Sequence, residues 1–275
     1  MSEFEYLRHI SIGQYLPLAT FVHKTDPRAK LLAYTVLIIA LSLSGSLFGL
    51  LIGLALTTAL LVSSHTPLSY ALRGWLTALP FLLILAVLQV FLNRMQTQSG
   101  ALFTIFGVGI HSEGLLAGFK LLLRFTALYG LLTVATATLS TLETIHALEM
   151  LLKPLRGLGI NPAPLAMMVQ IMLRFIPFLA LSAEKIAKSQ ASRGAQWDGK
   201  KGGLVARARR VLPLIIPLFI ISLRQAETLT DAMLARGFDS RLTRTSMHTY
   251  VFGLMDAVFL LFALFSALMV LFFPL

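Results

Sequence analysis

Two short triplets hold the residue types best suited to binding chemistry: Ser192-Arg193-Gly194 and Ala235-Arg236-Gly237. An arginine guanidinium can make two parallel hydrogen bonds to one carboxylate, which a lysine cannot imitate. Either triplet alone also fits an ordinary helix end, because glycine enters the left-handed conformation easily and a cation there complements the helix dipole. Two copies about forty residues apart favour a binding role over a coincidence of helix ends.

The sequence contains no pattern of an enzyme active site. A zinc-binding His-Glu-x-x-His helix, a Gly-x-Ser-x-Gly turn and a phosphate-binding loop are all absent. The 6 histidines are scattered and there is no cysteine, so neither a metal site nor another cofactor is expected. Asp256 is almost the only carboxylate in an apolar run, which argues against a proton-coupled or sodium-coupled transporter.

Composition places the chain in a membrane. Hydrophobic residues make up 57% of its 275 residues, above the share of about 45–50% that soluble domains have. Most of the apolar runs approach the ~20 residues that a spanning helix needs. They predict an all-α polytopic protein with about five spans, at 31–43, 47–62, 76–92, 114–138 and 251–273. The first two runs are short and separated only by Ser44 to Ser46, which predicts a helical hairpin or a re-entrant pair.

The basic residues predict the orientation of the chain. Lysine and arginine precede the first run, occur between the second and third, and fill the section between the fourth and fifth. The positive-inside rule then places the N-terminus and this long section in the cytoplasm and the C-terminus outside. This placement accounts for the net charge of +11 without nucleic acid as a partner. Lys120 and Arg124 lie inside the fourth run, where either a structural role or contact with a membrane partner is open.

Three helices must position the two triplets. Ser140 and Glu143 form a capping box that starts a short first helix. Prolines at 162 and 164 start the second helix, which ends at the first triplet, and the third ends at the second triplet. Pro177 is expected to kink the second helix. Their apolar stretches, 165–181 and 211–223, are expected to lie along the membrane surface or to pack under the spanning bundle. The predicted regions are 1–138, 139–244 and 245–275.

Together these segments resemble a known family, the transmembrane T components (EcfT/CbiQ-like) of energy-coupling factor (ECF) transporters. The resemblance covers nearly the whole chain. It rests on Ile12-Gly13-Gln14-Tyr15-Leu16-Pro17, Val22-His23-Lys24-Thr25-Asp26-Pro27-Arg28-Ala29-Lys30-Leu31-Leu32, Leu152-Lys153-Pro154-Leu155, Leu173-Arg174-Phe175-Ile176-Pro177 and the two triplets. The Gly13 to Pro17 segment looks more like the shared T components, which serve several substrate-binding subunits, than the dedicated ones.

The resemblance implies a non-catalytic subunit of an ATP-driven vitamin or micronutrient importer in the prokaryotic cell membrane. Its three cytoplasmic-side helices would be coupling helices, and the second and third would end in the docking residues for two ATP-binding-cassette (ABC) ATPases. These residues are Ser192, Arg193, Gly194, Ala235, Arg236 and Gly237. The coupling helices would also hold a separate substrate-binding membrane subunit, the S component. Ser192 departs from the family pattern, which commonly has alanine there, but a small residue is kept.

Two alternatives stay open at this point. Asp26, Pro27 and Arg28 fit an ordinary helix start at the membrane border as well as a contact with the ATPases or the coupling helices. The whole chain could also be a self-contained membrane enzyme that acts on lipid through a basic interfacial region. A weaker reading treats that region as a nonspecific anchor to anionic lipid.

Overall fold

The computed structural model describes residues 20–92, 103–105, 108–110, 112–159, 162–194, 204–239 and 250–272. The chain forms two compact units. The first, called here the bundle, is built from Gly13–Leu151 and Thr249–Leu275, and the second, called here the arm, includes Leu152–His248. The chain therefore leaves the bundle once, after residue 151, and returns to it once.

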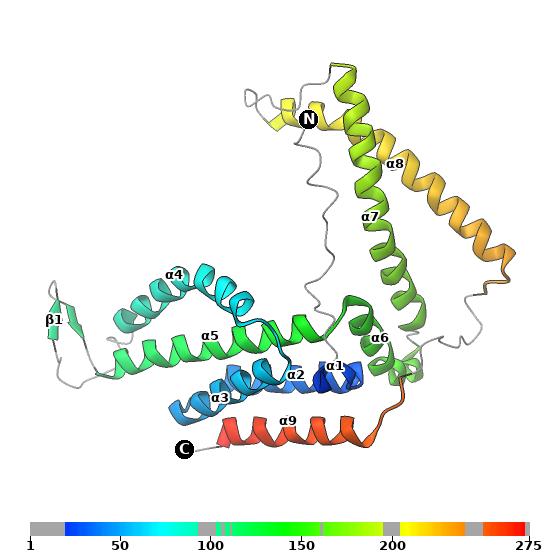
Figure 1. The fold of residues 1–275 in the computed structure, drawn as a ribbon. Helices are drawn as coiled ribbons and strands as arrows, with labels where there is room; N and C mark the ends of the chain where they lie inside the picture. Colours follow the sequence, from blue (N-terminus) through cyan, green and yellow to red (C-terminus); the bar gives the residue numbers. More distant parts are fainter. Residues whose placement is uncertain are drawn as a thin grey trace. The chain divides into compact units, whose positions relative to one another are not determined.

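The elements of the bundle are helical apart from one short antiparallel hairpin of β1 and β2 (Figure 1). They are α1 (Phe21–Lys24), α2 (Pro27–Leu43), α3 (Leu47–Ser63), α4 (Leu68–Leu92), β1 (Phe103–Ile105), β2 (Val108–Ile110), α5 (Ser112–Thr138), α6 (Thr141–Leu151) and α9 (Leu254–Phe272). The arm contains the 3₁₀ helix η3 (Lys153–Leu158), α7 (Pro162–Ser192) and α8 (Leu204–Ala235).

The core of the bundle lies where α2, α3, α5 and α9 run side by side (Figure 1). Leu41, Leu131 and Val134 are almost completely buried there, with Ala263 of α9 beside them. Small residues let the backbones approach closely, as is usual for helices packed in membranes. At Gly49 of α3, an added Cβ would lie 2.3 Å from the Val270 carbonyl oxygen of α9.

Polar contacts set the antiparallel register of α2 and α5. Lys30 near the start of α2 contacts Thr138 at the end of α5. Fourteen residues further along α2, and fourteen residues back along α5, Ser44 contacts Arg124. At about 1.5 Å per residue, both separations are about 21 Å. The first third of α5 therefore continues past the α2–α3 turn, and it packs there against α4.

The all-α polytopic membrane fold is confirmed. Within the described residues, five helices are long and apolar enough to cross a membrane: Leu72–Phe91, Ser112–Thr138, Pro162–Ser192, Val211–Ala235 and Leu254–Phe272. The set differs from the predicted one. It contains α7 and α8 of the arm, and it omits α2 and α3, because each of these has 17 residues and falls short of the usual spanning length.

Local signals for helix starts are confirmed. The Ser140 amide donates to Glu143 Oε2 at 3.0 Å, and the Glu143 amide donates to Ser140 Oγ at 3.2 Å, which completes the capping box of α6. The internal prolines do not end their helices: Pro177 lies inside α7, and Pro213 and Pro217 lie inside α8. In α4, which contains Pro80, the helix is arched (Figure 1).

Candidate functional site

The candidate site consists of the C-terminal ends of α7 and α8, two helices that contact each other within the arm. We call the triplets Ser192–Gly194 and Ala235–Gly237 the arginine tips. Each lies where the sequence predicted it, as the last helical residue and the two-residue turn after it. Each arginine side chain can either bind other residues of this protein or remain available to a partner protein.

The first arginine tip is a glycine-terminated helix end. Gly194 has φ +85°, in the left-handed region that favours glycine. Its amide donates to the Ala191 carbonyl at 3.0 Å, and the Arg193 amide donates to the Gln190 carbonyl at 3.1 Å. These bonds occupy carbonyls of the last turn that have no partner within a regular helix.

The second arginine tip repeats this geometry. Gly237 has φ +71°, and its amide donates to the Leu234 carbonyl at 2.9 Å. The next amide, of Phe238, reaches back to the Met233 carbonyl at 3.0 Å. This pair of bonds is the Schellman motif, which ends a helix in one fixed geometry. Both arginines therefore occupy the same position, one residue before a left-handed glycine.

Both tips are exposed. All six residues of the tips are open to solvent. Within the described part of the chain, no hydrogen bond or ion pair of the Arg193 or Arg236 side chain is found. A Cβ added at Gly194 or Gly237 would meet nothing within 4 Å, so the space beside each arginine is open. Two guanidinium groups are thus presented on rigid helix ends, in the form that binds carboxylates through two hydrogen bonds.

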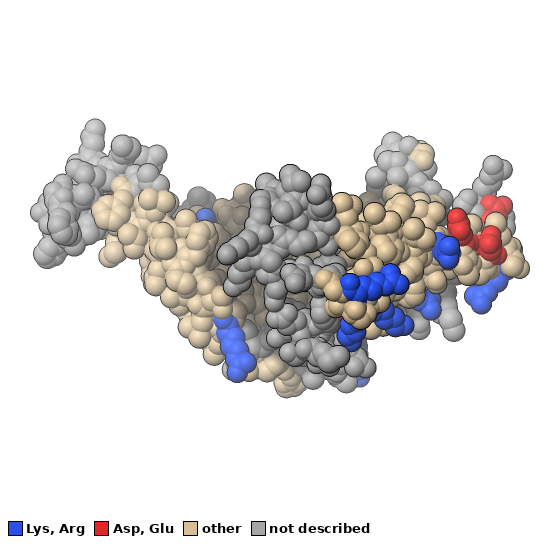
Figure 2. All heavy atoms as spheres, turned by 90° about the horizontal axis from the view of Figure 1, so that it is seen from above, with Lys and Arg blue, Asp and Glu red and all other residues tan. Residues whose placement is uncertain are grey.

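The surface behind the second tip is mixed in charge. Arg224, Glu227 and Asp231 are exposed on the last turns of α8. Figure 2 shows basic and acidic side chains together over this part of α8. A purely basic surface would suit unspecific attraction to anionic lipid, whereas mixed charge favours a partner whose own charges are arranged to match.

Lys120 and Arg124 have structural partners. Lys120 Nζ donates to the Gly45 carbonyl at 2.9 Å, and the Arg124 guanidinium donates to the Ser44 carbonyl. These carbonyls end α2, where a helix favours cations. Of the two roles left open for this pair, the observed contacts favour the structural one, because both side chains hold the turn between α2 and α3.

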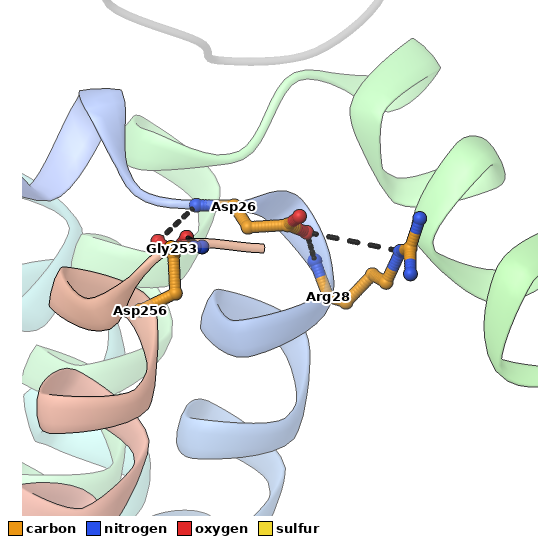
Figure 3. A network of polar contacts seen from close by, with 4 residues as sticks. All are labelled: Asp26, Arg28, Gly253 and Asp256. Atoms are coloured by element: carbon orange, nitrogen blue, oxygen red, sulfur yellow. Dashed lines mark hydrogen bonds and ion pairs between the residues drawn. The ribbon is translucent and has the colours of Figure 1, made fainter. Parts of the chain in front are cut away.

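Asp26, Pro27 and Arg28 form the start of α2. Asp26 Oδ1 accepts from the Arg28 amide at 2.8 Å, and Pro27 takes the first helical position. Figure 3 shows the Arg28 guanidinium pointing away from this cap, with Nε 3.9 Å from Asp26 Oδ1. The helix-start role of this motif is therefore confirmed, and contact of Arg28 with a partner stays a prediction.

Sequence reasoning missed the partner of this cap. Asp256 Oδ1 accepts from the Asp26 amide at 2.7 Å, across 230 residues of chain, and Asp256 Oδ2 accepts from the Gly253 amide at 2.8 Å (Figure 3). The isolated carboxylate in the last apolar run thus joins the starts of α2 and α9. The only hint in the sequence was that a carboxylate such as Asp256 is rare in an apolar run. Among the described residues, no three metal-ligating side chains gather into a site.

These features define a multi-pass, all-α membrane protein. The family model described as "Cobalt transport protein" (CbiQ) matches residues 19–250. The chain is 35% identical over 255 residues to the "Energy-coupling factor transporter transmembrane protein EcfT" of Brevibacillus brevis, covering 92% of this chain and 93% of that one. The proteins of the same name from Heliobacterium modesticaldum and Thermosediminibacter oceani are 37% and 36% identical, over 89% and 88% of this chain and 90% and 89% of theirs.

The chain therefore belongs to the EcfT/CbiQ-like family of transmembrane components of energy-coupling factor transporters. It is a multi-pass protein of the prokaryotic cell membrane and a non-catalytic transporter component. This membership removes the alternative of a self-contained enzyme that acts on lipid.

Proposed function

We propose that the chain couples two ABC ATPases to a separate substrate-binding membrane subunit in an ATP-driven importer of a vitamin or a metal micronutrient. Arg193 and Arg236 dock in acidic grooves of the two ATPases, one arginine tip to each. The observation that carries this proposal is the repeated geometry of the tips. Two helix ends that share this geometry, each with a guanidinium group that has no partner among the described residues, suit two similar partners better than one.

The substrate-binding subunit binds the apolar faces of α7 and α8. Supporting this, Met172 on α7 and Phe219 on α8 are 63% and 62% exposed, and Ile216 is 54% exposed. Such side chains suit either lipid or an apolar membrane partner. Interchangeable substrate-binding subunits are served by the same faces, as in a shared T component.

The coupling region, residues 139–244, lies on the cytoplasmic side, between the membrane region 1–138 and the last membrane helix in 245–275. Contacts within the bundle support placing three helix ends on the same side of the membrane. The start of α2, the end of α5 and the start of α9 meet through Asp26, Thr138 and Asp256. The C-terminus then lies outside the cell.

The docking proposal is tested by reversing both charges, with Arg193→Glu and Arg236→Glu together. Losing one partner of a desolvated charge pair costs about 2–5 kcal/mol, so we expect the ATPases to be lost from the purified complex and uptake to stop. Copurification of the ATPases and uptake into cells or vesicles are the measurements. Arg73→Glu, at an exposed arginine of α4 in the bundle, is the control and should keep both.

A second double variant separates docking from unspecific attraction to lipid. Arg193→Lys with Arg236→Lys keeps both charges and removes both planar forks. If docking needs the forks, the ATPases should still be lost from the purified complex or bind to it much more weakly. Normal uptake in this variant would contradict specific docking and favour the lipid-anchor reading.

A further inference from the structure

Lys30 is the largest side chain that is fully buried among the described residues. Its Nζ donates to the His23 carbonyl at 3.0 Å and to the Thr138 carbonyl at 3.2 Å. An ammonium group inside a protein is costly unless hydrogen bonds and opposite charges compensate for the lost water. Here burial lowers the pKa of Lys30, and the nearby charges of Glu143, Asp26 and Asp256 offset only part of that effect. A buried amine that costs stability in this way points to a structural purpose.

The position of Thr138 indicates that purpose. Thr138 is the last residue of α5, where carbonyls lack partners within the helix and cations are favoured. Its hydroxyl donates to the Val134 carbonyl at 2.7 Å, so the Tyr34 hydroxyl is the donor in its 2.9 Å bond to Thr138 Oγ1. Lys30 and Tyr34, one turn apart on α2, thus hold the end of α5 by both its carbonyl and its side chain.

Four helix ends meet at this place. The starts of α2 and α9 are joined by Asp256, the end of α5 is held by Lys30, and α6 starts three residues later with its capping box. We call this group the junction: Asp26, Lys30, Thr138, Glu143 and Asp256. Helix α6 also packs along α2, which places it on the same side as the junction.

The chain path makes the junction important. Two of the connections between the arm and the bundle are the end of α6 and the segment before α9. Both lead to the junction: α6 begins three residues after Thr138, and Asp256 in the first turn of α9 accepts a hydrogen bond from the Gly253 amide just before that helix. A force that travels along α6 toward α5, or along the segment that leads into α9, therefore reaches this group of residues.

We infer that Lys30 is a positioning residue that makes the junction rigid, so that movement of the arm is transmitted to the whole bundle rather than lost in bending between α5 and α6. This inference rests on the proposed coupling function. Coupling between distant sites is carried by packed elements and hydrogen-bond networks, and changes along such networks alter it measurably. Without Lys30, the end of α5 loses its hydrogen bond to α2, and the carboxylates near the junction lose one nearby positive charge.

The test is Lys30→Met in the full complex with its ATPases, reconstituted in lipid vesicles, with uptake and ATP hydrolysis measured together. Methionine keeps much of the side-chain volume and removes the charge. We expect the ATPases to copurify, hydrolysis to stay within about twofold of the unchanged protein, and uptake per ATP to fall about tenfold.

Lys120→Met is the matched control, because Lys120 also donates from Nζ to a backbone carbonyl, at the α2–α3 turn far from the junction. It should keep uptake per ATP near the unchanged value. An unchanged ratio in Lys30→Met, or an equal loss in both variants, overturns the inference.

Two further results keep the test decisive. If Lys30→Met does not accumulate in the membrane, Tyr34→Phe removes only the hydroxyl that donates to Thr138, and we expect a smaller loss of about threefold in uptake per ATP. An unchanged ratio in Tyr34→Phe overturns the inference. Failure of the proposed function would be seen separately, because the unchanged protein would then not copurify with any ATPase.

Discussion

At the scale of single residues, the glycines of the arginine tips matter through their backbone conformation. Gly194 and Gly237 have positive φ and open space around the position of a Cβ. A side chain there is opposed by backbone strain alone and not by collision with a neighbour. This separates the role of glycine in shaping the tip from any role in making room for a partner.

Gly237→Ala is expected to loosen the second tip. Alanine in the left-handed conformation costs about 1–2 kcal/mol, which corresponds to roughly a tenfold increase in the opening of the helix end. Hydrogen exchange of the Phe238 amide, which donates to the Met233 carbonyl, should become faster by about that factor. Gly157→Ala is the control, because Gly157 is also open but has no positive φ. If Gly157→Ala increased the exchange rate of the Phe238 amide as much as Gly237→Ala does, backbone strain at Gly237 would not be the cause.

At the scale of helices, close approach of backbones sets the packing of α3 against α9. Ser44 Oγ donates to the Val270 carbonyl at 3.1 Å, and Gly49 faces the same carbonyl. The contact joins the turn between α2 and α3 to the end of the last helix. It is available only because the residue at 49 has no side chain.

Gly49→Ala should therefore destabilise the bundle. Forcing an extra methyl group into a packed interior costs about 1–3 kcal/mol, which should lower the thermal midpoint of the detergent-solubilised protein by a few degrees. Gly45→Ala, four residues earlier, places its methyl group where nothing lies within 4 Å and should leave the midpoint unchanged. A Gly49→Ala variant as stable as the control would show that α3 and α9 are not held this closely.

Most helix bounds and caps could be predicted from local patterns, because caps, prolines and terminal glycines act within a few residues. The capping box at Ser140 and the ends of α7 and α8 are examples. The contacts of Lys30 with Thr138 and of Asp26 with Asp256 could not be predicted, since they depend on which helices pack together. The same holds for Arg124, whose carbonyl partner lies 80 residues away.

At the scale of the whole molecule, the orientation in the membrane can be tested directly because the chain has no cysteine. A single cysteine introduced as Ser192→Cys should stay unlabelled when a membrane-impermeant thiol reagent is added to intact cells, and should react after the cells are opened. Ser99→Cys, between the third and fourth predicted spans, is the control and should react from outside. Labelling of Ser192→Cys in intact cells would contradict a cytoplasmic arm.

The bond between Asp26 and Asp256 also sets an order of events during synthesis. The amide at the start of α2 leaves the ribosome 230 residues before the carboxylate that accepts its hydrogen bond. At about 5–20 residues per second, that interval is on the order of ten seconds or more. During this time the first helices must stay in the membrane while the Asp26 amide at the start of α2 lacks its acceptor. Only when α9 has been made can Asp256 accept that hydrogen bond.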